Sequence, residues 1–170
     1  MQIVLYGTSS SGKTSLAQAL QTLWPRPLIH IEADRFAPNF GSRHMASEDT
    51  DIRTRYVVAM HEAIAAFGRS GIDTIVDGSL PGERALRNDC FAILRRVPDT
   101  KVVAVRCSVD ELRVREARRS DRPVGWAEEQ SRTIYDGLEF DFNVDTTLGT
   151  AEDWARVLLP DLMANQRMVS

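Results

Sequence analysis

The chain has 170 residues, with 21 basic and 24 acidic side chains and a formal net charge of −3. This length suits a single domain over residues 1–170, and 43% hydrophobic with 26% charged residues excludes a disordered or collagen-like chain. The acid excess argues against nucleic acid or a membrane surface as a partner, and no apolar run approaches the roughly 20 residues of a membrane span. Two isolated cysteines, Cys90 and Cys107, have neither metal-site nor disulfide spacing and favour a reducing, cytoplasmic location.

Short apolar runs alternate with stretches of helical period along the chain. In order, they predict a strand at 3–6, a helix at 14–24, a strand at 28–32, a helix at 52–67, a strand at 72–76, a helix at 81–97, a strand at 101–106, helices at 109–119 and 126–139, a strand at 142–144 and a final helix at 154–162. Residues 35–50 show no clean period, and we interpret them as a functional loop or a broken short helix. The alternation predicts an α/β domain of three layers, in which a five-stranded parallel sheet has helices on both faces.

The segment GTSSSGKT stands between the first strand and the first helix and has the spacing of a P-loop, which binds nucleotide phosphates. Its glycines let the backbone curl so that N–H groups point at phosphate oxygens, and the following helix adds the positive end of its dipole. Lys13 can reach the β- and γ-phosphates, and the hydroxyl of Thr14 can ligate Mg²⁺. A chance glycine-rich turn is the alternative, and the flanking strand and helix argue against it. The residues expected to bind ATP are therefore Gly7, Thr8, Ser9, Ser10, Ser11, Gly12, Lys13 and Thr14.

Two acidic residues follow strands, at the edge of a parallel sheet where ligands bind. Asp77 follows a buried strand, as a Walker-B-type acid does, so we expect it near Mg²⁺ and the substrate. Asp34 precedes the irregular segment, and we expect it to take or orient the proton of an acceptor hydroxyl. Alternatively, either acid caps a loop or pairs with Arg35 or Arg84. Phe36 is a candidate for lining the acceptor pocket, although aromatic residues at such positions more often belong to a core.

Six arginines stand in a short stretch that is interrupted by four acids: Arg106, Arg113, Arg115, Arg118, Arg119 and Arg122. One interpretation is a lid over residues 113–126 whose guanidinium groups close on the transferring phosphate, with Arg119 and Arg122 as catalytic residues at its tip. Another is a solvated helix face with internal salt bridges. A nucleic-acid patch is the least favoured, because it would carry aromatic residues and fewer acids.

These features resemble the chloramphenicol phosphotransferase family of small P-loop kinases over nearly the whole chain. The resemblance rests on GTSSSGKT, on Asp34, on TIVDG at 74–78, and on the block VAVRCSVDELRVREARRSDRPVGWAEEQ with the later EFDFNVDTT. It implies a nucleoside-monophosphate-kinase-like fold and transfer of the ATP γ-phosphate to a primary hydroxyl of the antibiotic, and hence antibiotic resistance. The roles that the resemblance implies are a base for Asp34, phosphate binding for Gly12, Lys13 and Thr14, lid contacts for Arg119 and Arg122, and nucleotide contacts for Arg115 and Thr147.

The chain departs from the family pattern on the acceptor side. Gly78 stands where the family tends to have a second acid, a histidine is usual near Tyr135, and segment 35–50 is short. The small-molecule acceptor therefore stays open between a chloramphenicol-like compound and an ordinary metabolite such as a nucleoside or a sugar. A regulatory NTP-binding module without an acceptor is an alternative of another class.

Overall fold

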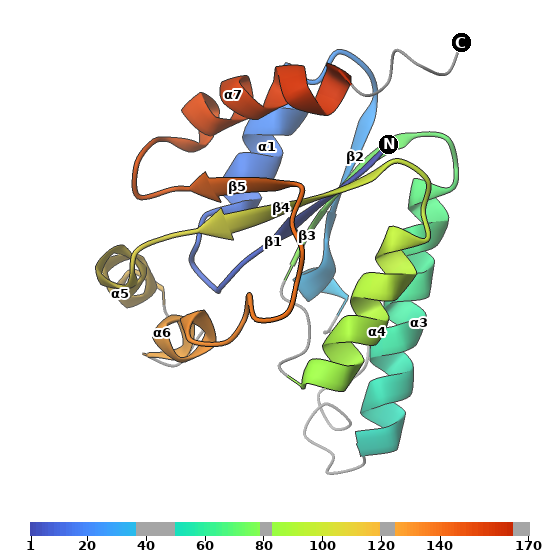
Figure 1. The fold of residues 1–170 in the computed structure, drawn as a ribbon, viewed down its shortest axis with the longest axis horizontal. Coiled ribbons are helices and arrows are strands. Elements are labelled where there is room, and N and C mark those ends of the chain that lie inside the picture. Colours follow the sequence, from blue (N-terminus) through green and yellow to red (C-terminus); the bar gives the residue numbers. More distant parts are fainter. Residues whose placement is uncertain (37–49, 79–82, 120–124, 165–170) are drawn as a thin grey trace.

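A parallel five-stranded sheet forms the centre of the computed structural model, which describes residues 1–36, 50–78, 83–119 and 125–164 (Figure 1). Its strands lie in the order β2-β3-β1-β4-β5, and every neighbouring pair is parallel. The central strand is buried along its whole length, which agrees with its uninterrupted apolar run. The bounds of the strands are β1 Gln2–Tyr6, β2 Leu28–Glu32, β3 Asp73–Asp77, β4 Thr100–Arg106 and β5 Phe142–Asp145.

Helices cover both faces of the sheet. On one face lie α1 (Lys13–Leu23) and α7 (Ala151–Ala164), and on the other lie α3 (Thr50–Gly68) and α4 (Arg84–Arg95) (Figure 1). The short helices α5 (Val109–Ala117) and α6 (Trp126–Ser131) follow β4 at the carboxyl edge of the sheet, and a 3-10 turn, η1 (Ala33–Arg35), follows β2. The predicted α/β fold, a five-stranded parallel sheet with helices on both faces, is confirmed.

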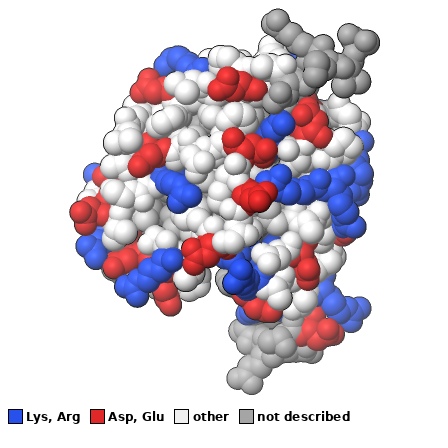
Figure 2. Space-filling view, in the orientation of Figure 1, with Lys and Arg blue, Asp and Glu red and all other residues white. Residues whose placement is uncertain are grey.

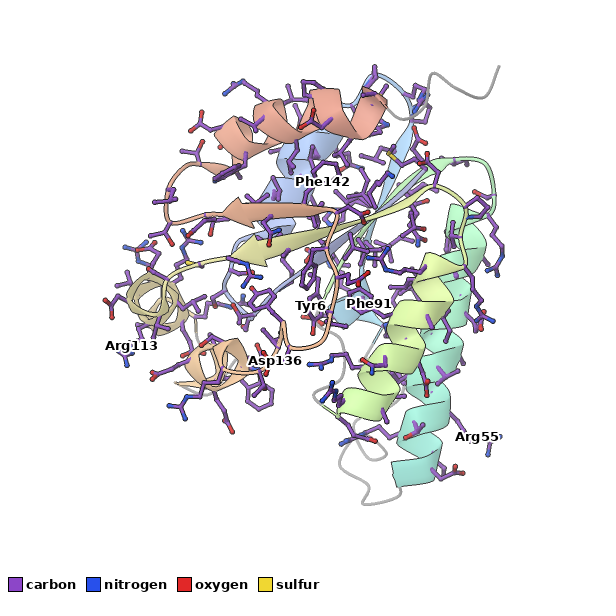
Figure 3. The ribbon with its side chains drawn as sticks, in the orientation of Figure 1. Tyr6, Arg55, Phe91, Arg113, Asp136 and Phe142 are labelled. Carbon is purple, nitrogen blue, oxygen red and sulfur yellow. The ribbon has the colours of Figure 1, made fainter. Side chains whose placement is uncertain are left out.

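Two apolar clusters hold the layers together, one on each face of the sheet. The α1 and α7 side includes Ile3, Leu5, Leu16, Leu20, Val105 and Leu158, and the α3 and α4 side includes Val4, Tyr6, Ile31, Ile64, Val76 and Phe91. Figure 3 shows Phe142 on the first side and Tyr6 and Phe91, whose rings meet edge to face, on the second. Successive β1 residues alternate between the two clusters, as the pleat of a strand requires. Both faces of the sheet are thus buried, and ligands can approach the strands at their ends.

One predicted element is wrong in extent. The helix expected over 126–139 ends at Ser131, and turns follow it. The buried Arg87 on α4 donates hydrogen bonds to the carbonyl oxygens of Thr133, Ile134 and Asp136 at 3.0–3.3 Å. These bonds hold the segment after α6 against α4 in turns, one of which is closed by the Asp136 N–H donating to the Thr133 carbonyl at 3.1 Å. The strand predicted at 28–32 has these bounds in β2, and the other predicted elements are present with shifted ends. Most of the irregular segment 35–50 lies outside the described residues.

Within the described part of the chain, no helix is long and apolar enough to cross a membrane. Cys90 and Cys107 are both free thiols. Acidic and basic side chains are interspersed over much of the face drawn in Figure 2.

Candidate active site

The P-loop joins the end of β1 to the start of α1 through a tightly packed turn. A Cβ atom on Gly7 would lie 2.2 Å from the carbonyl oxygen of Val105, so a side chain has no room there. Gly12 caps the N-terminus of α1 with a φ of 92°, a left-handed conformation that favours glycine. The two glycines of the motif are therefore explained by close packing at one end and by backbone conformation at the other.

Lys13 is buried at the first position of α1 and turns back over the loop. Its Nζ donates hydrogen bonds to the carbonyl oxygens of Gly7 at 3.0 Å and Thr8 at 2.7 Å. Close to it, the hydroxyls of Thr8, Ser10 and Ser11 are buried and have no hydrogen-bond partner among the residues that the structure describes. The loop thus carries one buried positive charge beside three hydroxyls that have no hydrogen-bond partner within the described residues.

A cavity of about 800 Å³ lies at the carboxyl edge of the sheet, beside the P-loop. Its walls come from five segments. The P-loop and α1 contribute Ser9, Ser10, Gly12, Lys13, Thr14 and Ser15, the end of β2 and η1 contribute Glu32, Asp34 and Arg35, and β3 contributes Asp77. The lid segment contributes Arg115 and Arg119, and the chain after β5 contributes Thr146, Gly149, Thr150, Ala151 and Glu152. Because β2 and β5 are the outer strands, the cavity extends across the sheet with the P-loop between its two ends. Ligands of open parallel sheets bind at this edge.

Two carboxylates that the sequence singled out differ in their surroundings. Asp34 lies on η1 and is exposed, whereas Asp77 ends β3 and is 4% exposed. The Nε2 atom of the partly buried His30 lies 3.6 Å from Oδ2 of Asp77, just beyond hydrogen-bond distance. Glu32, at the end of β2, forms a 2.9 Å ion pair with Arg35 on the same wall of the cavity. The β2 end of the cavity is therefore built from charged groups.

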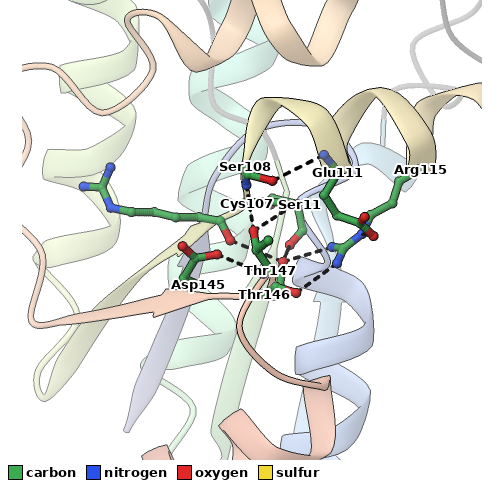
Figure 4. Close-up of polar contacts among 9 residues, drawn as sticks. Ser11, Cys107, Ser108, Glu111, Arg115, Asp145, Thr146 and Thr147 are labelled. Carbon is green, nitrogen blue, oxygen red and sulfur yellow. Dashed lines mark hydrogen bonds and ion pairs between the residues drawn. The ribbon is translucent and has the colours of Figure 1, made fainter.

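Thr146 connects the P-loop with helix α5 (Figure 4). Its hydroxyl donates to the carbonyl oxygen of Ser11 at 2.8 Å and accepts from Nη1 of Arg115 at 2.9 Å. Arg115 also donates to the Thr146 carbonyl and forms an ion pair with Glu111. The neighbouring Thr147 instead accepts from the backbone N–H of Ser108 at 2.8 Å, at the start of α5. Of the two adjacent threonines, Thr146 is thus the one that lines the cavity.

Helix α6 is attached to both α5 and the P-loop. The buried carboxylate of Glu116 accepts from the backbone N–H groups of Gly125 at 2.6 Å and Ala127 at 2.9 Å, which caps the N-terminus of α6. Farther along α6, Oε1 of Gln130 accepts from the backbone N–H of Ser9 at 2.8 Å. These contacts fix the base of the predicted lid relative to the phosphate-binding loop.

Tyr135 lies beside the start of the P-loop, where its hydroxyl would be 3.1 Å from a Cβ atom on Gly7. Its hydroxyl donates to the carbonyl oxygen of Val105 at 2.8 Å, and the guanidinium of Arg106 lies 4.2 Å from the centre of its ring. Burial raises the pKa of Tyr135, so its hydroxyl stays protonated and continues to donate.

The cavity brings together most of the residues that the sequence proposed for the site: Ser9, Ser10, Gly12, Lys13, Thr14, Asp34, Asp77, Arg115 and Arg119. Gly7, Thr8 and Ser11 belong to the buried body of the loop, and Phe36 packs against the apolar cluster under α3. Arg122 lies outside the described residues. Arg113 shows the salt-bridged alternative: it points to the surface in Figure 3 and pairs with Asp110 and Glu128.

Sequence reasoning missed several residues of the site. Glu32 is the last residue of the strand predicted at 28–32, so its place at the carboxyl edge of the sheet could have been inferred. Thr146, Glu116 and Gln130 carry no comparable local signal, because their contacts depend on how distant segments pack.

Comparison with known proteins agrees with this geometry. The family model described as "Chloramphenicol phosphotransferase-like protein" matches residues 1–163. The chain belongs to this family. Two Mycobacterium tuberculosis proteins of this similarity group, from strains CDC 1551 and H37Rv, bear the name "Putative O-phosphotransferase". Each is 31% identical over 182 residues, which cover 92% of this chain and 79% of the relative. The family resemblance and the prediction of a phosphotransferase are confirmed.

Solved kinase structures share the fold of this family member. A shikimate kinase from Acinetobacter baumannii has a TM-score of 0.71 at 17% identity and covers 97% of this chain and 94% of its own. A sugar kinase from Janibacter sp. HTCC2649 has a TM-score of 0.67 at 22% identity, with 95% and 94% covered. A gluconokinase from Sinorhizobium meliloti 1021 has a TM-score of 0.64 at 23% identity, with 98% and 93% covered. At these identities the likeness establishes the P-loop kinase fold.

Proposed function

We propose that this protein transfers the γ-phosphate of ATP to a hydroxyl group of a small molecule, with Mg²⁺ as cofactor. One observation carries the proposal: a single cavity contains both Lys13 and Thr14 of the P-loop and, at its β2 end, the carboxylate of Asp34. A donor phosphate held at the loop and an acceptor hydroxyl held at Asp34 would then share one cavity. The name of the Mycobacterium relatives agrees with a hydroxyl oxygen as the acceptor.

The chemistry of the loop fits a nucleotide phosphate. Buried polar groups without partners cost free energy, and the hydroxyls of Thr8, Ser10 and Ser11 are in this state within the described residues. Of the three, Ser10 lines the cavity, where phosphate oxygens would accept a hydrogen bond from its hydroxyl and bind the Lys13 ammonium. At the β5 end of the cavity, Arg115 and Thr146 are candidates for contacts with the nucleoside, and Thr147 would act through its contact with α5.

The donor set also fits Mg²⁺. No group of three His, Cys, Asp or Glu side chains able to hold a metal is found among the described residues. Mg²⁺ in kinases is usually bound through one or two protein oxygens, substrate phosphates and water, so a larger cluster is not needed. Thr14 and Asp77 line the same cavity and would hold the ion, which would neutralise charge on the phosphates.

In the proposed reaction, Asp34 takes the proton of the acceptor hydroxyl while the hydroxyl oxygen bonds to the γ-phosphorus. The bond from that phosphorus to the bridging oxygen breaks, and ADP leaves. Lys13 stabilises the charge that develops on the phosphates, and Arg119 and Arg122 of the lid would bind the transferring group and exclude water. Residues 1–170 would act as one kinase domain in a reducing cytoplasm. The family name suggests chloramphenicol as the acceptor, and phosphorylation of this antibiotic would give resistance to it.

Asp34→Asn tests this assignment. The variant should bind ATP with unchanged affinity, measured by calorimetry, while acceptor-dependent ADP release falls by about 10²-fold or more. Asp110→Asn, an exposed acid on α5 outside the cavity, serves as the control. Unchanged turnover in Asp34→Asn would exclude Asp34 as the base.

A further inference from the structure

The wall of the cavity at its β2 end is made of charged side chains, and this composition limits which acceptors can bind there. Glu32, Asp34 and Arg35 line it from β2 and η1, and Asp77 lines it from the neighbouring strand. Among all the lining residues that the structure describes, Ala151 is the single apolar side chain, and it lies after β5 at the opposite end. Phe36 directs its apolar contacts to the buried cluster that contains Val4 and Ile31. The described wall therefore offers an acceptor hydrogen bonds and charges rather than an apolar surface.

Glu32 and Arg35 form the part of this wall that the proposed phosphoryl transfer does not use. Their ion pair measures 2.9 Å, and the Glu32 side chain is 27% exposed, so its carboxylate is partly withdrawn from water but still reachable from the cavity. A carboxylate accepts hydrogen bonds from hydroxyl groups and a guanidinium donates them, so the pair presents both kinds of partner side by side. A compound with several neighbouring hydroxyls can satisfy both groups at once.

The other classes of acceptor are less suited to this wall. An aryl or alkyl group would displace water from the carboxylates without replacing its hydrogen bonds, which is unfavourable. An acceptor that carries its own carboxylate would lie beside three negative charges, those of Glu32, Asp34 and Asp77, which outnumber the one positive charge of Arg35 on this wall, so the net interaction is repulsive. A neutral compound rich in hydroxyl groups meets neither penalty.

We propose that the acceptor is a compact, neutral, polyhydroxylated compound of sugar size, and that Glu32 and Arg35 select it by binding hydroxyls other than the one that is phosphorylated. This inference rests on the proposed kinase function and names the substrate class of the same site. It makes Glu32 a specificity residue, with no part in the transfer of the phosphate itself.

The first experiment compares acceptor classes with the full chain, ATP and Mg²⁺, and follows ADP release. The panel contains neutral sugars and cyclic polyols, sugar acids of the same size, and chloramphenicol as the aryl-bearing alcohol. At least one neutral polyol should give a kcat/KM roughly tenfold or more above every acid and above chloramphenicol. Turnover that is highest with chloramphenicol or with an acid overturns the inference and leaves the kinase function intact. ATP binding without turnover in any class overturns the proposed function itself.

The second experiment uses Glu32 variants with the best polyol. Glu32→Gln should raise the KM for the polyol about tenfold, because a charge-assisted hydrogen bond is lost, and should leave the KM for ATP within about twofold. Glu32→Leu should increase the ratio of turnover with chloramphenicol to turnover with the polyol. Glu139→Gln, an exposed position away from the cavity, is the control. Equal changes in both KM values, accompanied by a lower melting temperature, would assign Glu32 a structural role and overturn its part in selection.

Discussion

The side chain of Gln130 accepts a 2.8 Å hydrogen bond from the backbone N–H of Ser9, across 121 positions of sequence. Ser9 is 1% exposed, so little water can replace this acceptor. The contact ties helix α6, at the base of the predicted lid, to the loop that we propose binds the phosphates of ATP. The geometry of the loop therefore depends on a helix that is distant in sequence.

Gln130→Met should lower kcat/KM for ATP roughly tenfold or more. The substitution keeps the length of the side chain but removes the acceptor, and a buried N–H that loses its partner costs about 1–3 kcal/mol. Steady-state kinetics at varied ATP concentration would measure the effect. Glu129→Met, on the exposed side of the same helix, is the matched control and should behave like the wild type. Similar losses in both variants would show that α6 as a whole, rather than the Gln130 contact, supports the loop.

Lys13→Ala should reduce phosphoryl transfer by about 10²-fold or more while the protein stays folded, because the substitution removes the ammonium that we propose stabilises the developing phosphate charge. Lys13→Arg should not restore activity, since a guanidinium is wider and more rigid than an ammonium. The chain has one other lysine, Lys101 on β4, away from the cavity, and Lys101→Ala provides the control. Activity is followed by ADP release and folding by circular dichroism. Full activity in Lys13→Ala would contradict the proposed nucleotide site.

Asp77→Asn should raise the Mg²⁺ concentration needed for half-maximal activity by about tenfold or more, because a charged oxygen ligand is replaced by a neutral one. A Mg²⁺ titration of activity at saturating ATP measures this. Asp73, four residues earlier on β3, offers a control on the same strand, since it binds Trp24 and Arg26 instead. Burial raises the pKa of Asp73, but the hydrogen bond from Trp24 and the nearby positive charges outweigh this and lower it below its ordinary value.

Asp73→Asn should therefore lower the free energy of unfolding by about 1–3 kcal/mol at neutral pH and leave the Mg²⁺ dependence unchanged. A shift of the Mg²⁺ requirement in Asp73→Asn but not in Asp77→Asn would contradict the assignment of the metal site.

His61 should make the stability of the fold depend on pH. Burial lowers the pKa of this histidine, which is 2% exposed on α3, below the ordinary value of 6.5. Above pH 6.5 the imidazole is neutral in both states, so its contribution is complete there. As the pH falls below this value the unfolded chain binds a proton that the folded chain does not, and stability decreases by up to about 1.4 kcal/mol per pH unit until the folded pKa is reached.

The comparison with His61→Gln isolates this contribution. Urea unfolding at pH 7.5 and pH 5.5 should show a smaller loss of stability for the variant than for the wild type. Parallel losses in the two proteins would show that other groups govern the pH dependence.

The order of strands and helices was accessible from sequence because each element carries its own pattern. The run from Ile3 to Tyr6 is apolar throughout since both faces of β1 are covered. Pro25 follows Trp24, the C-cap residue of α1, and marks the end of that helix. Helix α6 was overextended because Ile134 and Leu138 continue a helical spacing. The carbonyls there bind Arg87, 46–49 residues away, and no local pattern reveals such a partner.

The same limit applies to the candidate site. The P-loop and the acids at strand ends are encoded by residue type and position along the chain, and they do line one cavity. Sequence alone could not show whether Thr146 or Thr147 lines the cavity, since both are threonines. The turn after β5 decides which of the two hydroxyls binds the Ser11 carbonyl. Glu116 had the sequence context of a surface acid on a charged helix, yet it is 3% exposed.

The two oxygens of Glu116 hold the end of α5 and the beginning of α6 together from a single carboxylate. Loss of this carboxylate would leave two backbone N–H groups at the start of α6 without their acceptor, although the carboxylate itself belongs to α5. In evolutionary terms, the residue at position 116 is therefore constrained by the helix that follows it as well as by its own helix.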